Sequence, residues 1–542
     1  MSTTLTDPDR AAPPPPAAPA GEGPGDAARS DRILVIGTAI ALAVGLASSV
    51  WQLTMRPFWH DEAISVGATH QLRQTIRGTG GTMAVYYVLL DGWTALFGTS
   101  LVAVRSLSVL TALVAVVATA LFVRRALRPL EGALAVILLA GLPAFSRMSQ
   151  DARAYALAMV LTAACWICLD RALEADEADP GDRRAWPWFL ALGPVAVVGV
   201  GSHGLFLLQL APVMASVLFL PRRWHLVVRL LPAAVMTAVA VGALMSIGAS
   251  DVGDWVPPLS ADQARSFVGS MLTYDEWPEL LLGGLMVVGV VVLVGRAVRS
   301  AALDRWRALV PVWWALVPPL ALLVLSVPRP SLIGRYVMAS VPGIAMLIAV
   351  GTVQLLPIGR PCGAASTRDR PSTARTAGRV LWGVAAVALV VVLVWGVALG
   401  RVTRGSLSYE SWDDAAALVA EEARPGDALI FNPSGRGQFP DDTARPAFEA
   451  AWAREDPTVT PDVLSPARPL GEVRRFDDGV PLSELSELMM GYGRVWFVQF
   501  PGFGGTFREL LALEPAASAF QREQVTTFDG GVQVLLVVRN DR

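Results

Sequence analysis

The chain has 542 residues, of which 53% are hydrophobic and 17% are charged, and its net charge at pH 7 is −2. Soluble globular domains carry about 25% charged residues, so this composition excludes an ordinary soluble protein and indicates a polytopic membrane protein. The near-neutral charge gives no electrostatic basis for a nucleic-acid partner. The basic residues are all arginine, and alanine and glycine are abundant, which suggests a GC-rich bacterial genome of the actinobacterial type.

The first 32 residues are polar and rich in proline and alanine, and they include the run Pro13 to Pro16. Such a segment cannot bury enough apolar surface to fold. It is also too long and too polar to be the n-region of a signal peptide. We therefore expect a disordered cytoplasmic tail over 1–32, followed by an uncleaved membrane span from Ile33 to about Leu53.

A helix of about 20 apolar residues crosses the hydrocarbon core of a bilayer. Ten further apolar runs are candidates for such spans. They lie near 101–123, 131–148, 154–173, 186–204, 205–220, 227–248, 279–295, 308–327, 336–356 and 380–400. The sequence therefore predicts a polytopic α-helical membrane domain over 33–400 with about eleven spans.

Arginine residues concentrate in alternate loops between these runs. The arginine-rich loops lie near 124–128, 183–184, 222–223, 296–307 and 360–379, and Arg29 and Arg32 precede the first span. Cytoplasmic loops of membrane proteins carry an excess of basic residues. This alternation predicts a multi-pass protein of the cytoplasmic (plasma) membrane, with its N-terminus in the cytoplasm and its C-terminal domain outside.

Two segments between the first and second spans do not have the pattern of a span. From Asp61 to Ile76, apolar or small residues recur every four positions, which predicts an amphipathic helix along the outer surface. Residues 84–97 are apolar but too short to cross the membrane, and they contain Asp91. We expect a second surface or re-entrant helix there, so that the two helices form a layer over the bundle.

The composition becomes more polar from about Gly405. Residues 411–423 and 507–513 have helical patterns, and 428–432, 495–500 and 532–538 read as strands. This alternation predicts a small extracytoplasmic α/β domain over 401–542. The glycine cluster at 502–505 is more typical of a turn than of a phosphate-binding loop.

Four motifs resemble those of the GT-C superfamily of integral membrane glycosyltransferases. Its family-39-like group, which includes protein O-mannosyltransferases and the aminoarabinose transferases of lipid A, is the most similar. The motifs are Asp61-Glu62-Ala63, the GTMAVYY run at 81–87, Arg105-Ser106-Leu107-Ser108, and the SQDARAYAL run at 149–157. The second motif departs from the His-Pro-Pro-Leu-Tyr-Tyr common in the group. His203 and Gly334-Arg335-Tyr336 also stand where the group often has His and Arg-Tyr.

The resemblance implies an inverting transferase that moves a mannose-like or arabinose-like sugar from a polyprenyl-phosphate donor. The acceptor would be a hydroxyl group of a protein, glycolipid or polysaccharide at the outer face of the membrane. This chemistry needs a base for the acceptor hydroxyl and cations for the departing phosphate. No cofactor is obligatory. A divalent cation, Mg²⁺ or Mn²⁺, would use Asp61, Glu62 and Asp151 if one binds.

The resemblance also suggests individual roles. Asp61 is the candidate general base, and Glu62 would assist it. Three arginines are candidates for binding the donor phosphate, since the guanidinium fork suits phosphate oxygens: Arg105, Arg153 and Arg335. Four residues are candidates for binding the sugar or the acceptor: His60, Tyr87, Asp151 and His203.

Ordinary structural roles compete with these assignments. Aspartate is a favoured helix N-cap and glutamate suits a first helical turn, which describes Asp61 and Glu62 equally well. Arg335 would snorkel to the membrane interface, and Arg105 would neutralise a buried Asp91. Asp151 and Arg153 form a solvated surface pair in this interpretation, and the two histidines are structural or interfacial residues.

Two other classes of function remain open. The first is a lipid-sugar flippase or another transporter, and the second is a non-catalytic assembly protein with the same fold. Transporters often show internal repeats and charges at mid-membrane. The sequence shows no such repeat, and its acidic residues cluster at outer loop ends, which favours a site at the membrane surface. The Asp61-Glu62 pair favours an enzyme over an assembly protein.

Overall fold

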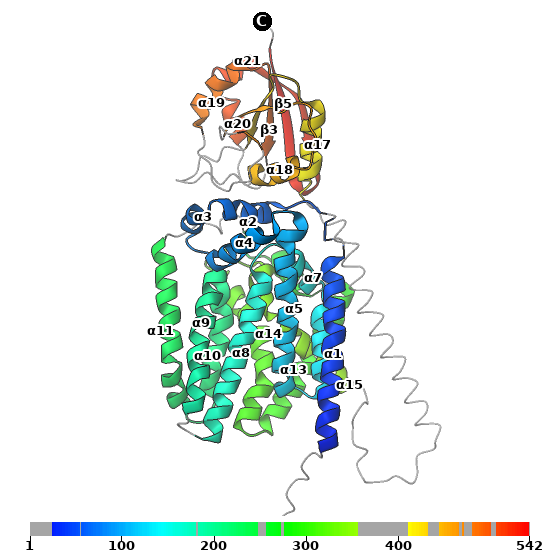
Figure 1. The fold of residues 1–542 in the computed structure, drawn as a ribbon, viewed down its shortest axis with the longest axis vertical. Helices are drawn as coiled ribbons and strands as arrows, with labels where there is room; N and C mark the ends of the chain where they lie inside the picture. Colours follow the sequence, from blue (N-terminus) through cyan, green and yellow to red (C-terminus); the bar gives the residue numbers. More distant parts are fainter. Residues whose placement is uncertain are drawn as a thin grey trace, which may run out of the picture.

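A computed structural model describes residues 24–51, 53–54, 56–179, 183–247, 256–272, 276–355, 410–431, 444–465, 469–470, 480–499 and 506–540. It shows a bundle of long helices, a layer of short helices at one end of the bundle, and an α/β domain beyond this layer (Figure 1). The first helix begins at Pro24, so the predicted disordered tail over 1–32 is wrong over its last nine residues. Asp31 in this stretch forms an ion pair with Arg124 at 3.1 Å, which holds the helical extension beside the next span.

The bundle is made of eleven helices in the described part of the chain. They are α1 (Pro24–Val50), α5 (Leu101–Ala126), α6 (Pro129–Gly141), α7 (Pro143–Gln150), α8 (Tyr155–Ala178), α9 (Trp186–Ser202), α10 (Leu207–Ala215), α11 (Arg223–Ile247), α13 (Glu276–Val298), α14 (Ala302–Leu325) and α15 (Val341–Leu355). Short 3₁₀ turns flank them, namely η1 (Arg183–Ala185), η2 (Gly204–Phe206), η3 (Ser216–Phe219) and η4 (Gly334–Ser340).

The predicted polytopic helical fold is confirmed, with differences in the number of spans. Eight helical segments of the described residues are long and apolar enough to cross a membrane. The run near 131–148 is a pair of helices, α6 and α7, bent by 54°. The bend follows from Pro143, which disfavours helical geometry at the preceding residue. The run near 205–220 is a shorter apolar helix, Gly204–Phe219, and the run near 380–400 lies outside the described residues.

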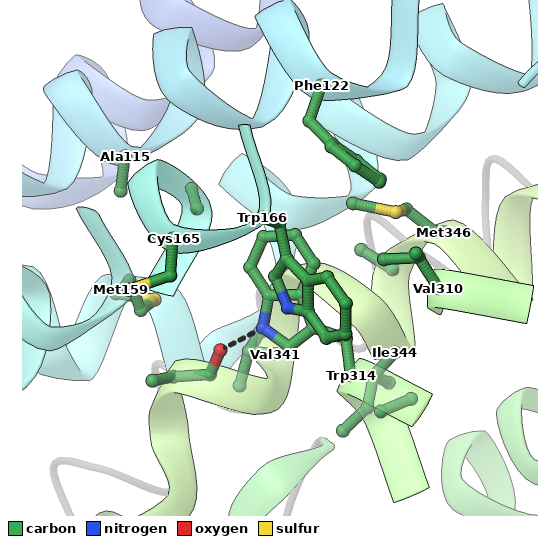
Figure 2. Packing of buried hydrophobic residues seen from close by; sticks show 14 of the residues in the cluster. Ala115, Phe122, Met159, Cys165, Trp166, Val310, Trp314, Val341, Ile344 and Met346 are labelled. Carbon is green, nitrogen blue, oxygen red and sulfur yellow. Dashed lines mark hydrogen bonds between the residues drawn. The ribbon is translucent and has the colours of Figure 1, made fainter. Parts of the chain in front are cut away.

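The centre of the bundle is the segment of η4 and α15, Gly334–Leu355, whose most apolar stretch is 89% buried, against 17% for α11. Close backbone contact explains this burial. A Cβ atom added at Gly351 would lie 2.0 Å from the Leu285 carbonyl oxygen of α13, so only glycine fits there. Trp314 of α14 packs in the same core, and its Nε1–H donates to the Ala339 carbonyl at 2.6 Å (Figure 2).

The predicted layer over the bundle consists of α2 (His60–His70), α3 (Leu72–Gly78) and α4 (Ala84–Phe97) (Figure 1). A further short helix, α12 (Ala261–Met271), packs against η4. The residues from Asp61 to Ala68 are all buried, so α2 is not the one-sided surface helix that its spacing predicts. The reason is that the C-terminal domain covers its second face, through a helix that packs directly on α2.

The C-terminal domain is a five-stranded mixed sheet with helices, in the strand order β2-β1-β3-β5-β4. Its elements are α17 (Trp412–Glu422), β1 (Ala428–Phe431), α18 (Ala444–Trp452), β2 (Asp462–Ser465), α19 (Leu482–Leu488), η5 (Met489–Gly491), β3 (Arg494–Gln499), α20 (Thr506–Leu510), α21 (Ala516–Ala519), β4 (Phe520–Thr527), η7 (Asp529–Gly531) and β5 (Gln533–Arg539). Strand β1 pairs in parallel with β2 and β3, and β5 is antiparallel to β3 and β4.

The small α/β domain predicted from the sequence is therefore confirmed. Strands β2 and β4 were not predicted, because β2 is short with only two apolar residues, whereas the equally short β1 is wholly apolar, and β4 is mostly exposed and polar. The glycine cluster at 502–505 lies outside the described residues. Apolar side chains of α17, α18 and the sheet form one continuous cluster with those of α2 and α4, so the domain is docked on the layer of short helices.

Buried carboxylates pair with arginines at the end of the bundle opposite this domain. Asp170 of α8 accepts hydrogen bonds from Arg125 of α5 and from Nε of Arg307 of α14, the latter at 2.7 Å. Glu131 of α6 is fully buried and accepts two bonds from Arg296 of α13, at 2.8 and 2.6 Å. The arginines at this end therefore hold helices together, in addition to any role in setting the topology.

We predict that Asp170→Asn destabilises the bundle. Removing one partner from a buried ion pair costs up to about 3–5 kcal/mol. Here Arg125 and Arg307 lose their buried carboxylate and keep only partly exposed acidic partners such as Glu174. The measurement is thermal unfolding of the purified protein in detergent. Asp304→Asn is the control, since Asp304 is 69% exposed and lies 3.7 Å from the same Arg307. Equal midpoints for the two variants would contradict the prediction.

Candidate active site

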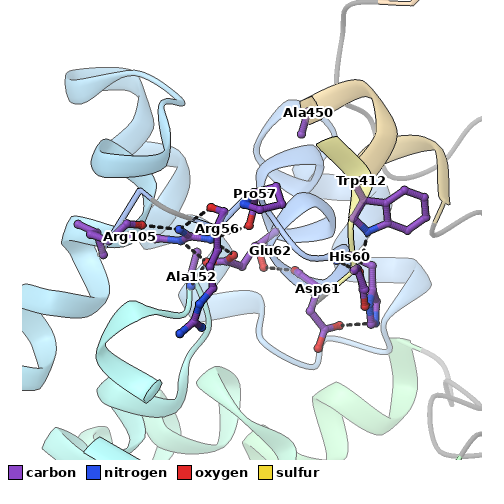
Figure 3. A network of polar contacts seen from close by, with 12 residues as sticks. Arg56, Pro57, His60, Asp61, Glu62, Arg105, Ala152, Trp412 and Ala450 are labelled. Atoms are coloured by element: carbon purple, nitrogen blue, oxygen red, sulfur yellow. Dashed lines mark hydrogen bonds and ion pairs between the residues drawn. The ribbon is translucent and has the colours of Figure 1, made fainter. Parts of the chain in front are cut away.

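A buried ion pair organises the N-terminal end of α2. Glu62 is fully buried, and its two carboxylate oxygens accept hydrogen bonds from Nε and Nη2 of Arg105 at 2.9 and 2.6 Å (Figure 3). The backbone N–H of Ala152 donates to the same carboxylate at 3.0 Å. Glu62 thus joins α2 to α5 and to the loop between α7 and α8.

Arg105 also fixes the loop between α1 and α2. Its Nη1 donates to the carbonyls of Leu53 and Arg56 at 2.5 and 3.1 Å, and its Nη2 donates to the carbonyl of Pro57 at 2.9 Å. All five N–H groups of the guanidinium are therefore engaged inside the protein. Arg105 has no donor left for a phosphate in this arrangement, and its carboxylate partner is Glu62 rather than the alternative, Asp91.

Asp61, next to Glu62, faces a different environment. Its carboxylate lies 3.6 Å from Nη2 of Arg153, 3.6 Å from Nη2 of Arg335 and 3.7 Å from Nε2 of His60. These groups come from the α7–α8 loop, from η4 and from α2. Asp61 lies in the first turn of α2, where the N-cap is Trp59, so it is not the helix cap considered as an alternative. One carboxylate is thus surrounded by three basic groups.

Arg153 and Asp151 do not form a surface pair with each other. Arg153 points at α2, where its Nη1 also donates to the Asp61 carbonyl at 3.3 Å and to the Ser65 hydroxyl at 3.4 Å. Burial lowers the pKa of Arg153, but Asp61, Tyr87 and other neighbours outweigh it and raise the pKa overall. For Asp151, burial and the nearby Glu62 carboxylate raise the pKa to about 6.

Arg335 is directed into the site rather than toward the membrane interface. Its guanidinium lies over the ring of Trp59, 5.3 Å from the centroid, as well as beside Asp61. Tyr87 is buried in α4 next to Tyr86, with 6.3 Å between the ring centroids. The structure therefore brings Asp61, Arg153 and Arg335 into contact, with Tyr87 in the electrostatic surroundings of Arg153.

A small pocket of about 10 Å³, partly open to solvent, lies beside Arg335. Its polar lining consists of Tyr155, His203, Gln209, Arg335 and Tyr336. The ring of His203 lies between the two tyrosine rings, 5.7 Å from each. Burial, with the charges of Arg153 and Arg335, lowers the pKa of His203 to about 4. His203 is therefore neutral at pH 7 and presents one donor and one acceptor.

His60 has a partner that the sequence did not suggest. Its backbone N–H donates to Oε2 of Glu410 at 2.7 Å, and its Nδ1 forms a short hydrogen bond with Oε1. Glu410 precedes α17 of the C-terminal domain, 350 positions along the chain. No local pattern marks this residue, because its role depends on how the two domains dock.

The electrostatic surroundings suit an anion better than a metal ion. The described residues contain no group of three or more His, Cys, Asp or Glu side chains that could hold a metal. Glu62 is saturated by Arg105, and Asp61 is surrounded by basic groups, which repel a cation. A divalent cation at Asp61, Glu62 and Asp151 stays an expectation from the resemblance.

The fold of this chain is similar to that of solved structures. The chain resembles ArnT from Cupriavidus metallidurans bound to undecaprenyl phosphate, with a TM-score of 0.53 and 16% identity over 93% of this chain and 97% of that chain. It also resembles the archaeal oligosaccharyltransferase AglB from Archaeoglobus fulgidus in complex with an inhibitory peptide and a dolichol-phosphate, with a TM-score of 0.50 and 12% identity over 88% and 70% of the two chains.

The chain therefore has the GT-C fold of integral membrane glycosyltransferases, as its motifs predict. Residues 83–247 match the family described as dolichyl-phosphate-mannose-protein mannosyltransferase. This match includes Arg105, Asp151, Arg153 and His203, but it ends before Arg335 and begins after Asp61. No curated protein matches the sequence.

We predict that His203 makes folding stability fall in acid. Its usual pKa of 6.5 applies to the unfolded chain, and the folded value is about 4. The unfolded state therefore binds more protons between these values, so stability is complete above pH 6.5 and declines by about 3 kcal/mol as the pH falls toward 4. Thermal unfolding from pH 7.5 to 4.5 should show a shallower decline for His203→Gln than for the unchanged protein. Parallel declines would contradict this prediction.

Proposed function

We propose that the protein transfers a sugar from a polyprenyl-phosphate donor to a hydroxyl acceptor, with Asp61 as the general base. The observation that carries the proposal is the contact of Asp61 with Arg153 and Arg335, which come from separate elements and converge on one carboxylate. The GT-C fold supports it. A base beside two arginines is the set of groups needed to deprotonate an alcohol and to stabilise a departing phosphate.

The lengths of the contacts suggest how donor binding would activate the base. Strong charge-assisted hydrogen bonds from nitrogen to oxygen are about 2.7–2.9 Å long, whereas both arginines lie 3.6 Å from Asp61. A phosphate group carries more charge and more acceptor oxygens than one carboxylate, so it would attract the guanidinium groups. Asp61 would then lose cationic neighbours, its proton affinity would rise, and it would accept the proton of the acceptor hydroxyl.

The same movement is needed for inversion. A direct displacement places the attacking oxygen and the leaving phosphate on opposite sides of the anomeric carbon. The base and the phosphate-binding cations must therefore stand apart when the donor is bound, although Asp61 and Arg335 are in contact without it. The inverting outcome that we propose requires at least one arginine to leave the carboxylate with the phosphate.

The side chains that line the pocket beside Arg335 have the chemistry to contact the sugar ring of the donor, and the pocket of about 10 Å³ would have to widen to admit it. Tyr155 and Tyr336 present aromatic faces to it, and neutral His203 between them can donate one hydrogen bond and accept another. Sugar hydroxyl groups both donate and accept hydrogen bonds, so a neutral imidazole suits them better than an imidazolium. A mannose-like or arabinose-like ring fits this chemistry, and the acceptor is a hydroxyl of a protein, glycolipid or polysaccharide.

The proposed location is the outer face of the cytoplasmic membrane. The site and the C-terminal domain lie at one end of the bundle (Figure 1). Arg125 at the end of α5, Arg296 at the end of α13 and Arg307 near the start of α14 lie at the other end, where they pair with α8 and α6. Since basic residues concentrate on the cytoplasmic side, this distribution supports an extracytoplasmic site.

The first test is Asp61→Asn. Loss of a general base typically lowers the rate by about 10²–10⁴-fold, and asparagine keeps the size of the side chain. Sugar transfer is measured in detergent with labelled polyprenyl-phosphate mannose and polyprenyl-phosphate arabinose as donors. We expect kcat to fall at least 100-fold while donor binding remains.

Asp91→Asn is the matched control, because Asp91 lies in α4 of the same layer. A folded Asp61→Asn variant with full activity would remove Asp61 as the base. If the unchanged protein moves the labelled lipid between leaflets of a vesicle but never transfers its sugar, it is a flippase and the proposed function is wrong.

The second test concerns the phosphate and uses Arg335→Lys. Lysine keeps the charge but loses the planar fork that bonds two phosphate oxygens, so we expect KM for the donor to rise about tenfold, a loss of about 1.4 kcal/mol. KM for the acceptor should stay nearly constant. Arg329→Lys is the control, since Arg329 is exposed in the preceding loop. An unchanged donor KM in Arg335→Lys would place the phosphate elsewhere.

A further inference from the structure

We propose that Glu410 of the C-terminal domain is a positioning residue that completes the active site by holding His60 against Asp61. The proposal rests on the function proposed above and adds a role for a domain in which the sequence shows no catalytic motif. The geometry behind it is a chain of three side chains, Glu410, His60 and Asp61, that connects the C-terminal domain to the carboxylate of the base.

Glu410 holds His60 at two points. One carboxylate oxygen accepts from the backbone N–H of His60 at 2.7 Å, and the other bonds to Nδ1 of the ring. The first contact fixes the start of α2, and the second fixes the rotation of the imidazole. With both fixed, Nε2 lies 3.7 Å from Oδ1 of Asp61. A side chain with only one of these contacts would be free to turn away from the base.

Glu410 itself is rigid because it is tied to the core of its own domain. Its Oε2 accepts a hydrogen bond from Nε1 of Trp412 at 2.7 Å. Trp412 is fully buried in the cluster that joins α17 to α18 and α2. The backbone N–H of the intervening Ser411 donates to the Asp529 carbonyl at 3.0 Å. The position of the Glu410 carboxylate is therefore set by the fold of the C-terminal domain.

The charges around His60 give this contact a chemical effect. A carboxylate lies at each ring nitrogen, Glu410 at Nδ1 and Asp61 at Nε2, and Arg335 opposes them from η4. The edge-to-face ring of Trp59 is 5.0 Å away. Two carboxylates favour an imidazolium that points one N–H at each, so Glu410 orients a donor toward Asp61. The carboxylate of Asp61 then keeps its orientation when an arginine moves to the phosphate.

The consequence is that the membrane domain alone is incomplete. The C-terminal domain supplies Glu410, and its helix α18 packs on α2, which carries both His60 and Asp61. Glu410→Gln in the full-length protein tests this role. The substitution hardly changes the side-chain volume, and the amide oxygen can still accept the hydrogen bond from Trp412. We expect kcat to fall about 10- to 100-fold with little change in KM for the donor, since Glu410 does not touch the phosphate-binding arginines.

His60→Gln should cause a similar loss, and the double variant should lose little more, because both changes break one chain of contacts. Glu410→Asp should be less active than the unchanged protein and more active than Glu410→Gln. The control is Glu421→Gln, an exposed acid on α17, the helix that follows Glu410, and it should leave kcat unchanged. Fully additive losses, or wild-type kcat in Glu410→Gln, would overturn the proposal.

A spectroscopic readout tests the contact independently of activity. The protein has four histidines, so isotope-labelled histidine gives few signals, and His60→Gln assigns the one of interest. We expect Glu410→Gln to shift the His60 ring signals and Glu421→Gln to leave them in place. Unshifted signals would overturn the positioning role even if the enzyme is a transferase. Shifted signals with an active Asp61→Asn variant would instead show that the contact exists and that the proposed base is wrong.

Discussion

The buried ion pair between Glu62 and Arg105 is the constraint on which the site depends. It bonds α2 to α5, and its remaining hydrogen bonds fix the loop after α1 and the loop before α8. A charged pair without water persists only when every donor and acceptor is satisfied, and here all of them are. Since Asp61 is next to Glu62 on α2, the ion pair that holds Glu62 also fixes the backbone position of the proposed base.

The two adjacent carboxylates therefore have different roles for a physical reason. Glu62 has short, bidentate contacts with one arginine, Arg105. Asp61 has longer contacts with two arginines and a histidine that come from three different elements. Short and saturated contacts stabilise a structure, whereas longer and shared contacts can be exchanged for a ligand at low cost. This difference separates a structural acid from a reactive one.

Much of the fold was predictable because its signals are local. Apolar runs and arginine loops indicated the spans, and the motifs around Asp61, Arg153 and Arg335 indicated a shared site, which the structure brings together without testing its chemistry. The partners of Glu62 and His60 were not predictable. Arg105 lies 43 positions from Glu62, and Glu410 lies 350 positions from His60. The burial of both faces of α2 was missed for the same reason. The spacing of apolar residues along a helix does not reveal that a distant domain packs on its other face.

α11 and the segment of η4 and α15 are both apolar enough to cross a membrane, although the most apolar stretch of the first is 17% buried and that of the second 89%. Lipid accepts almost any apolar side chain, so α11 can exchange leucine, valine and methionine freely. In α15, Gly343 and Gly351 touch the backbones of neighbouring helices, and no larger residue fits. Amino-acid substitutions should therefore accumulate quickly along α11 and slowly along α15. The positions of the membrane domain that tolerate the fewest substitutions should be small residues far from any reacting atom.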